Sequence, residues 1–537
     1  RPTAAPPPLL LTARSDAPST MAMHFVNVLL NGHDVSDFTD PRLLCWNVVA
    51  TLVCTCDTVA AALVSIAVNI FAMLFLGVIV VARAVRFVAD LIAAHIQPDG
   101  VGVSSAVNML DPSFLEVPLT NQEAQIIANK LNTPLPPRDQ LHQCKDVLLL
   151  FLRICASAYE EEARCRQYLN NLALARRATR RVFENCSCIV VAWGTVIVVA
   201  FKGTSPFNLN EWLCDFSIKK AGRTPKTRFL GCDIAGQVHD GFYHALFPPG
   251  ANQGYPTTPF ATIVATVHEI MQAQQIRPED LNLWVTGHSL GAAVATMFVT
   301  VLATATKAVD AAALGGLPDD VTPAEREAHA NLRAVAVLRN GLNGVVTFGN
   351  PRVVDNVLAH RVDHFLAARN VRFLRVRNGN DVVSTVPLDF EFVTTVASVL
   401  RYFAPEGAIN DVALELDYNY VGEGVRFSHT GRVMRTTELD NQGALLQVAL
   451  FVPRLIRSGL QYATNTIMSV VTAAFTPLIP QGVFGPGGLL AASRVRRDTF
   501  LSAAIKIISA PTLGVSTLLT DHIPSEYFKH IGAARAG

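Results

Sequence analysis

The chain has 537 residues, which is enough for one large α/β domain with accessory segments. Its formal net charge is +1 and only 16% of its residues are charged, a balance that excludes a basic nucleic-acid-binding surface and an acidic tail. Half of the residues are hydrophobic, and the excess lies near the N-terminus. The ten cysteines show no metal-ligand spacing, which argues against a zinc site, and their scatter suits a reducing compartment.

The N-terminal part of the chain is predicted to be a disordered segment followed by a membrane anchor. Residues 1–40 begin with a stretch rich in Pro, Ala, Ser and Thr, a composition typical of disorder. Within 41–96, the uncharged run 58–82 is long enough to cross a bilayer. A buried core helix is the alternative. A signal peptide is disfavoured because the run is too long and begins too far into the chain.

The residues that flank run 58–82 bear on its topology. A single span is expected, and a hairpin that also uses the shorter apolar run 43–56 stays open. Arg83 and Arg86 follow the span, whereas Arg42 precedes it. The positive-inside rule therefore predicts that the bulk of the chain, which follows the span, is cytosolic.

The rest of the chain is predicted to form a linker at 97–140 and an α/β domain at 141–537. Residues 141–181 have a helical pattern. Strand patterns occur at 189–193, 195–201, 281–286, 344–348 and 371–376. Gly194 joins the first two strands as a tight hairpin. Because helical segments separate the later strands, we expect a mostly parallel central sheet with helices on both faces.

Two segments of this domain are predicted insertions. Residues 307–339 are Ala-rich and contain Gly-Gly and Pro-Asp-Asp breakers, which indicate a surface insertion. Residues 439–517 are unusually apolar. They could shape a lipid tunnel, lie on a membrane surface or belong to the core, and the pattern leaves these alternatives open.

The most informative stretch is 281–300, which reads LNLWVTGHSLGAAVATMFVT. An apolar run ends in Gly-His-Ser-Leu-Gly, and a helical run of small residues follows at once. This is the context of a nucleophile elbow, in which glycines flank a serine that is exposed in front of a helix N-terminus. Ser289 is therefore predicted to be a nucleophile, and a structural glycine-rich turn is the alternative.

A serine hydroxyl needs a base that removes its proton and a carboxylate that orients the base. In hydrolases of this topology both follow the serine, in the order Ser, Asp, His. Asp381 lies just beyond the strand pattern 371–376, where it is a candidate acid or a turn-capping residue. His429 and His522 compete for the role of the base, and His530 is a remote third candidate.

Four motifs in order make the chain resemble one family. They are Gly203-Thr204-Ser205, Gly287-His288-Ser289-Leu290-Gly291, Thr347-Phe348-Gly349-Asn350-Pro351-Arg352 and Asn380-Asp381-Val382-Val383. Class 3 lipases, which include fungal triacylglycerol lipases and membrane-anchored diacylglycerol lipases, carry these motifs in this order. The resemblance covers 141 to the C-terminus and implies an α/β-hydrolase fold.

The resemblance also assigns the acid and the base. On the family pattern the acid is Asp381. The family carries a Phe-Ser-His-x-Gly segment whose histidine is structural, which matches His429 here. A later Asp-His segment holds the catalytic histidine, which matches His522. The long segment 439–517 between these two histidines is larger than in the compact fungal enzymes, and it leaves His429 as the alternative base.

The oxyanion of the reaction needs donors that are fixed in advance. One is expected to be the backbone N–H of Leu290, directly after the nucleophile. By resemblance, the second donor is Thr204, in the loop after strand 195–201. The amphipathic segment 206–216 stands where the family has a mobile lid over an acyl groove, and a helix packed on the core is the alternative. The lid and substrate-binding candidates are Phe207, Leu209, Trp212 and Leu213.

These features predict a membrane-associated serine lipase that hydrolyses acyl esters of di- or triacylglycerols. The expected partners are a lipid substrate and a bilayer, with no nucleic acid, and the chemistry needs no metal or organic cofactor. One alternative is a phospholipase A1 or galactolipase that cleaves the same kind of bond. The other is an inactive lipid-binding scaffold that keeps the fold.

Overall fold

The structure is a computed structural model, and part of the chain is described. The described residues are 105, 107–108, 111–172, 178–183, 186–203, 226–229, 232–248, 258–304, 323–379, 381, 383–385, 418–428, 431–436 and 521–534. Run 58–82, segment 206–216 and segment 439–517 lie outside them, so the predictions on these segments stay predictions. Within the described ranges, no helix combines the length and the apolar character that crossing a bilayer requires.

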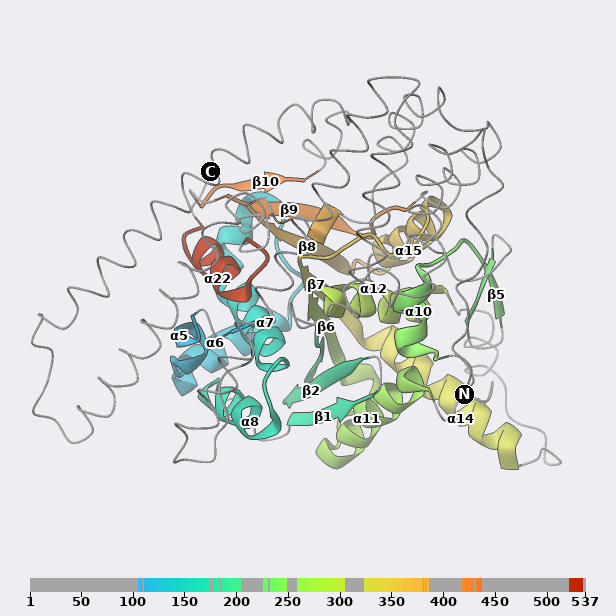
Figure 1. Cartoon of the computed structure of the whole chain (residues 1–537). Helices are drawn as coiled ribbons and strands as arrows, with labels where there is room; N and C mark the ends of the chain where they lie inside the picture. Colours follow the sequence, from blue (N-terminus) through green and yellow to red (C-terminus); the bar gives the residue numbers. More distant parts are fainter. Residues whose placement is uncertain are drawn as a thin grey trace, which may run out of the picture.

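The described part is built on one mixed sheet of eight strands (Figure 1). In spatial order they are β1 (Ala178–Val182), β2 (Ser187–Trp193), β3 (Val196–Phe201), β6 (Asn282–His288), β7 (Leu342–Phe348), β8 (Arg372–Asn378), β9 (Glu423–Phe427) and β10 (Val433–Arg435). The central pairs from β3 to β9 are parallel, and the pairs at both edges are antiparallel. A separate antiparallel hairpin consists of β4 (Lys226–Phe229) and β5 (Cys232–Ala235).

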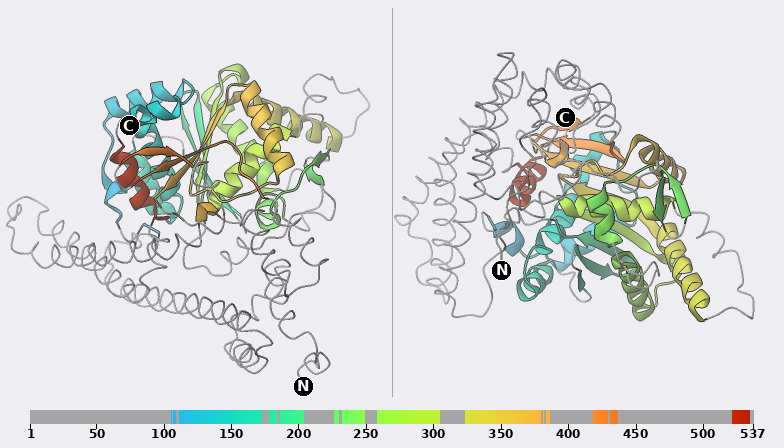
Figure 2. Two further views of the ribbon diagram at one scale, coloured as in Figure 1. Left: turned by 90° about the horizontal axis from the view of Figure 1, so that it is seen from above. Right: turned by 45° about the vertical axis from the view of Figure 1, so that its right-hand side comes forward.

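Helices cover both faces of the sheet, so the fold has three layers (Figures 1 and 2). One face carries α10 (Asp240–Leu246), α11 (Pro259–Gln274), α12 (Leu290–Thr304), α14 (Pro323–Gly341) and α15 (Asn356–Ala368). The other carries α5 (Ser113–Glu116), α6 (Asn121–Leu131), α7 (Lys145–Ser157), α8 (Glu162–Asn171) and α22 (Pro524–Gly532). Short 3₁₀ turns are η1 (Arg138–Cys144), η4 (Pro278–Asp280) and η5 (Val383–Thr385).

The strand sequences explain the two layers of helices. In β3, Ile197 and Val199 belong to one buried cluster, whereas Val196 and Val198 belong to the other. Because successive side chains point to opposite faces of a sheet, a continuous apolar strand needs cover on both sides. The parallel strands with helices on both faces give the α/β-hydrolase arrangement, and β2, β3, β6, β7 and β8 confirm the strands that the sequence predicts.

Three expectations about secondary structure need correction. The described part of the predicted linker 97–140 holds α5 and α6, and Leu115 and Leu131 are buried there. The predicted insertion 307–339 contains most of α14, whose Leu338 is fully buried. The helical pattern predicted for 141–181 does not hold to its end, because residues 178–181 belong to strand β1. In the first two cases a few apolar residues, such as Leu115, Leu131 and Leu338, pack in the core, which composition alone does not weigh.

Candidate active site

The predicted nucleophile lies in a tight turn between β6 and α12. Ser289 has a φ of 62°, a backbone conformation that is costly for a residue with a side chain. Its N–H donates to the carbonyl of Phe348 over 2.9 Å, which ties the turn to β7. A Cβ on Gly287 would clash with the backbone of Gly291, and one on Gly291 would clash with the backbone of Phe201. The two glycines are therefore required by close packing on either side of Ser289.

The predicted acid lies just after β8 and is fully buried. The backbone N–H of Asp381 donates to the carbonyl of Asn378 over 2.9 Å. One carboxylate oxygen, Oδ1, accepts from the backbone N–H of Val383 over 2.9 Å. The other, Oδ2, lies 2.9 Å from His522 Nδ1 and accepts from the Tyr527 hydroxyl over 2.5 Å. Three donors thus fix the carboxylate, and one of them is the predicted base.

His522 lies two residues before α22, and hydrogen bonds to the carbonyls of Asp521 and His522 fix its backbone. The side-chain amide of Asn378 donates to the carbonyl of Asp521 over 2.8 Å. The carbonyl of His522 itself is 2.7 Å from Nε2 of His288, the residue that precedes the nucleophile. The two imidazole centroids are 4.6 Å apart. The loop that carries the base is therefore attached to the nucleophile elbow.

The hydrogen bonds of His288 define its protonation. A carbonyl oxygen only accepts, so His288 Nε2 carries the proton that is donated to His522. His288 Nδ1 lies 2.9 Å from the hydroxyl of Tyr159 and accepts from it in the neutral ring. Burial, and then the neighbouring His522, lower the pKa of His288 to about 3. His288 is therefore neutral at physiological pH and connects Tyr159, two residues after α7, to the backbone of the base.

Electrostatics favour an ionised acid and a protonated tyrosine. Burial alone would raise the pKa of Asp381, but His522, Tyr527 and Arg377 together bring the pKa below its ordinary value. Burial and the adjacent Asp381 carboxylate raise the pKa of Tyr527 well above its ordinary value. Tyr527 therefore keeps its proton at neutral pH and stays a hydrogen-bond donor to Asp381.

Two further glycines let neighbouring loops approach these residues. A Cβ on Gly203, just after β3, would clash with the Tyr159 hydroxyl and lie 3.0 Å from Cβ of Ser289. Gly349, after β7, has a φ of 60°, and a Cβ there would lie 2.7 Å from Cε1 of His522. The loops that follow β3, β6, β7 and β8 therefore converge at the carboxyl end of the sheet, where α/β enzymes place their sites.

The structure places some of the predicted site residues and leaves others outside its described part. Ser289, Asp381 and His522 lie at this end of the sheet, and Leu290 is the first residue of α12, so its N–H lies at a helix N-terminus. Thr204, Phe207, Leu209, Trp212, Leu213 and His429 are not among the described residues. In the described ranges, no group of three or more His, Cys, Asp or Glu side chains could hold a metal ion.

Two residues of the site were missed from the sequence. Tyr527 donates to the same oxygen as His522, and Tyr159 supports His288 from the end of α7. The sequence signal for Tyr527 is slight, since it stands five residues after His522 on the predicted terminal segment. Tyr159 has no local signal, because its partner is 129 residues away in the chain.

Comparisons with known proteins match the part of the chain that carries Ser289 and Asp381. Residues 198–315 and 328–391, which include Ser289 and Asp381, match the model of the family described as lipase (class 3). A triacylglycerol lipase of Ricinus communis is 26% identical over 230 residues, which are 37% of this chain and 36% of that protein. A triacylglycerol lipase of Arabidopsis thaliana is 24% identical over 269 residues, which are 45% of this chain and 44% of that protein. The chain thus matches less than half the length of either relative.

Solved lipase structures are also similar to part of the chain. The Rhizomucor miehei lipase propeptide complex has a TM-score of 0.27 and 18% identity, and the match covers 47% of this chain and 55% of that one. A fungal lipase–inhibitor complex has a TM-score of 0.30 and 16% identity, and the match covers 53% of this chain and 80% of that one. The fold is defined by the strand order of the sheet itself. Over residues 198–315 and 328–391 the chain is therefore similar to class 3 lipases.

Proposed function

We propose that this protein is a serine lipase that hydrolyses acyl ester bonds of di- or triacylglycerols. The observation that carries the proposal is the hydrogen-bonded pair of Asp381 and His522, at the end of the sheet where the Ser289 elbow also lies. The family match and the two plant triacylglycerol lipases support the substrate class.

The proposed mechanism follows from the roles of the two imidazole nitrogens. Asp381 holds Nδ1–H of His522, so Nε2 is the nitrogen that takes the proton from Ser289 Oγ as it attacks the ester carbonyl. The N–H groups of Leu290 and Thr204 stabilise the resulting oxyanion. The C–O bond to the alcohol then breaks, His522 returns the proton to the alcohol, and an acyl-enzyme remains. Water hydrolyses this ester by the same steps, which restores Ser289 and releases the fatty acid.

The proposal includes access from a membrane. Run 58–82 anchors the chain, with the domain on the cytosolic side, and the apolar residues of segment 206–216 uncover the acyl groove at a lipid surface. Deletion of residues 1–86 tests the anchor, because every proposed catalytic residue lies beyond it. The truncated protein should leave the membrane fraction and keep its activity on short soluble esters. If the truncated protein still pellets with vesicles, a segment other than run 58–82 binds the membrane.

A fluorophosphonate probe and a substrate panel test the chemistry. The probe should label the detergent-solubilised full chain and leave Ser289→Ala unlabelled, with both proteins showing the same thermal unfolding. Labelling that persists in the variant would place the nucleophile elsewhere, and no labelling of either protein would favour the inactive scaffold. In a panel of diacylglycerol, triacylglycerol and phosphatidylcholine, we expect the neutral lipids to be the better substrates. Preferential release of fatty acid from phosphatidylcholine would favour a phospholipase.

A further inference from the structure

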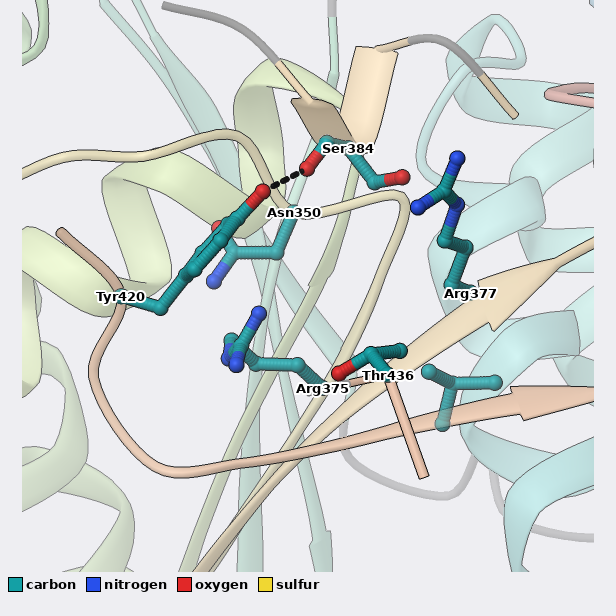
Figure 3. A pocket seen from close by; sticks show the side chains of 7 residues that line it. Asn350, Arg375, Arg377, Ser384, Tyr420 and Thr436 are labelled. Atoms are coloured by element: carbon teal, nitrogen blue, oxygen red, sulfur yellow. Dashed lines mark hydrogen bonds between the residues drawn. The ribbon is translucent and has the colours of Figure 1, made fainter. Parts of the chain in front are cut away.

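The acid and the base of the proposed site are held by different parts of the chain. The loop of Asp381 is supported by residues that follow it in sequence. The Ser384 hydroxyl donates to the Asp381 carbonyl over 2.9 Å. The Tyr420 hydroxyl donates in turn to the carbonyl of Ser384, at the pocket drawn in Figure 3. The loop of His522 is instead supported, through His288, by a residue that precedes the whole sheet.

That residue is Tyr159, which lies in the turn after α7 and whose hydroxyl borders the nucleophile. The hydroxyl is 2.9 Å from Nδ1 of His288 and 3.4 Å from the carbonyl of the same residue. A Cβ on Gly203 would clash with this hydroxyl and would lie 3.0 Å from Cβ of Ser289. Nε2 of the His288 ring donates to the carbonyl of His522 over 2.7 Å. The position of the turn after α7 therefore sets the position of the loop that carries the base.

The same turn contains a buried carboxylate that the proposed mechanism does not use. Glu160, the residue after Tyr159, is 1% exposed. Its Oε1 accepts from the Ser105 hydroxyl over 2.9 Å and from the side-chain amide of Asn108 over 2.7 Å. Its Oε2 accepts from the backbone N–H of Ser105 over 2.9 Å. A buried carboxylate is costly unless such donors replace water, so Glu160 holds Ser105 and Asn108 against the turn.

Asn108 binds the turn at a second point. Its side chain is buried, and the amide nitrogen carries two hydrogens. Besides Glu160, this nitrogen donates to the carbonyl of Ala156, in the last turn of α7, over 2.8 Å. The two hydrogen bonds span the chain from Ala156 to Glu160, and Tyr159 lies between these residues. Asn108 and Glu160 therefore fix the backbone that carries the Tyr159 ring.

We propose that Asn108 and Glu160 are positioning residues for the catalytic base. They fix the turn after α7, the Tyr159 hydroxyl in this turn fixes the ring of His288, and that ring holds the carbonyl of His522. The inference rests on the proposed function, because the role of His522 as the base belongs to it. Asn108 precedes α5, so part of the predicted linker 97–140 takes part in holding the catalytic site.

Hydrolysis of a short soluble ester by the full chain in detergent tests this role. Glu160→Gln replaces an acceptor oxygen with an amide group that donates, and Tyr159→Phe removes only the hydroxyl that contacts His288. Each variant should lower kcat about three- to tenfold and leave KM unchanged, the effect of one lost hydrogen bond on the transition state. In the Tyr159→Phe background, Glu160→Gln should lower kcat less than about twofold, because the connection to the base is already broken.

Asp111→Asn is the matched control, because it also changes a carboxylate to an amide in the predicted linker. Asp111 contacts Lys529, which has another carboxylate at 2.7 Å, so this variant should keep the parental kcat. If Glu160→Gln does not fold, Ser105→Ala removes a single donor to Glu160 and should lower kcat about two- to threefold. A parental kcat in the variant that folds, or the same loss with and without the Tyr159 hydroxyl, would overturn the inference.

Amide hydrogen exchange of the full chain gives a readout that does not require activity. Peptides that cover 521–527 should exchange about threefold faster or more in Glu160→Gln and Tyr159→Phe than in the parent, because the carbonyl of His522 loses its fixed donor. Asp111→Asn should exchange like the parent. Parental exchange of these peptides in Glu160→Gln would contradict the connection. If the parent hydrolyses no ester, the proposed function fails, and the exchange rates alone decide whether Glu160 holds His522 in place.

Discussion

The nucleophile and the acid–base pair of the proposed site are built in opposite ways. The elbow around Ser289 comes from one continuous stretch, in which β6, the turn and α12 follow one another without a break. The pair of Asp381 and His522 joins residues that are 141 positions apart in the chain. The first is a local structure that adjacent residues specify, and the second exists only when β8 and α22 are docked.

This difference indicates which substitutions should damage the elbow and which should damage the acid–base pair. The elbow depends on close backbone packing, so an added methyl group next to Ser289 damages it. The pair depends on hydrogen bonds that hold two loops together, namely those from Tyr527 to Asp381 and from Asn378 to the carbonyl of Asp521. Losing one of them leaves the fold in place and displaces a catalytic group.

The largest effect is expected from removal of the base. His522→Ala should lower kcat by roughly 10⁴- to 10⁶-fold, because Ser289 then lacks an acceptor for its proton. His429→Ala should keep measurable activity and lose mainly thermal stability. Turnover of a soluble ester by both purified variants, with melting curves as a check of folding, decides between the two histidines. The reverse ranking would transfer the role of the base to His429.

A smaller effect, on the free energy of unfolding, is expected from an added methyl group in the elbow. The same change in α22, the helix that follows the base, should have almost no effect. Gly291→Ala should destabilise the protein by about 3 kcal/mol, because the new Cβ has no space beside the backbone of Phe201. Gly532→Ala, in α22, meets no atom within 4 Å and should be neutral or slightly stabilising. Urea unfolding of both variants measures the difference. Equal stability of the two would show that the elbow is not tightly packed.

Acid should lower the stability of the folded protein through His288, which hydrogen-bonds the turn of the nucleophile to the loop of the base. Its pKa is about 3 in the folded protein and 6.5 when unfolded, so the unfolded state binds one more proton between these values. Stability is therefore complete above pH 6.5 and is lost as the pH falls, by up to about 2 kcal/mol between pH 6.5 and 5. Unfolding curves at several pH values should show a shallower loss in His288→Gln. The same pH slope in both proteins would contradict a buried neutral imidazole.

The smallest effect should come from Tyr527→Phe. It removes one donor from Asp381, so the pKa of Asp381 rises and the carboxylate is held less firmly. We expect kcat to fall about tenfold with little change in KM, since a hydrogen bond to a charged group contributes about 1.5–3 kcal/mol. Tyr168→Phe, which removes another buried hydroxyl away from the site, is the control. Parental turnover in Tyr527→Phe would mean that His522 and Val383 alone suffice to hold Asp381.

The sequence by itself determined the local features of this protein. The glycines and small residues of 281–300 specify a strand, a tight turn and a close-packed helix, and the apolar runs specify five strands of the sheet. These patterns are readable because each depends on neighbours within one turn of helix or one strand. The prediction of a linker at 97–140 missed α5 and α6. These short helices are stabilised by the tertiary contacts of a few buried residues, such as Leu115 and Leu131, which a local pattern does not reveal.

Only the tertiary structure decided how the distant parts meet. The hydrogen bond between Asp381 and His522 follows from the docking of α22 beside β8, and the neutral state of His288 follows from its burial between Tyr159 and the carbonyl of His522. The hydrogen bonds from Ser105 and Asn108 to Glu160 likewise join residues that are 55 and 52 positions apart. Distances and burial set these hydrogen bonds and charges, and neither is a property of a residue and its sequence neighbours alone.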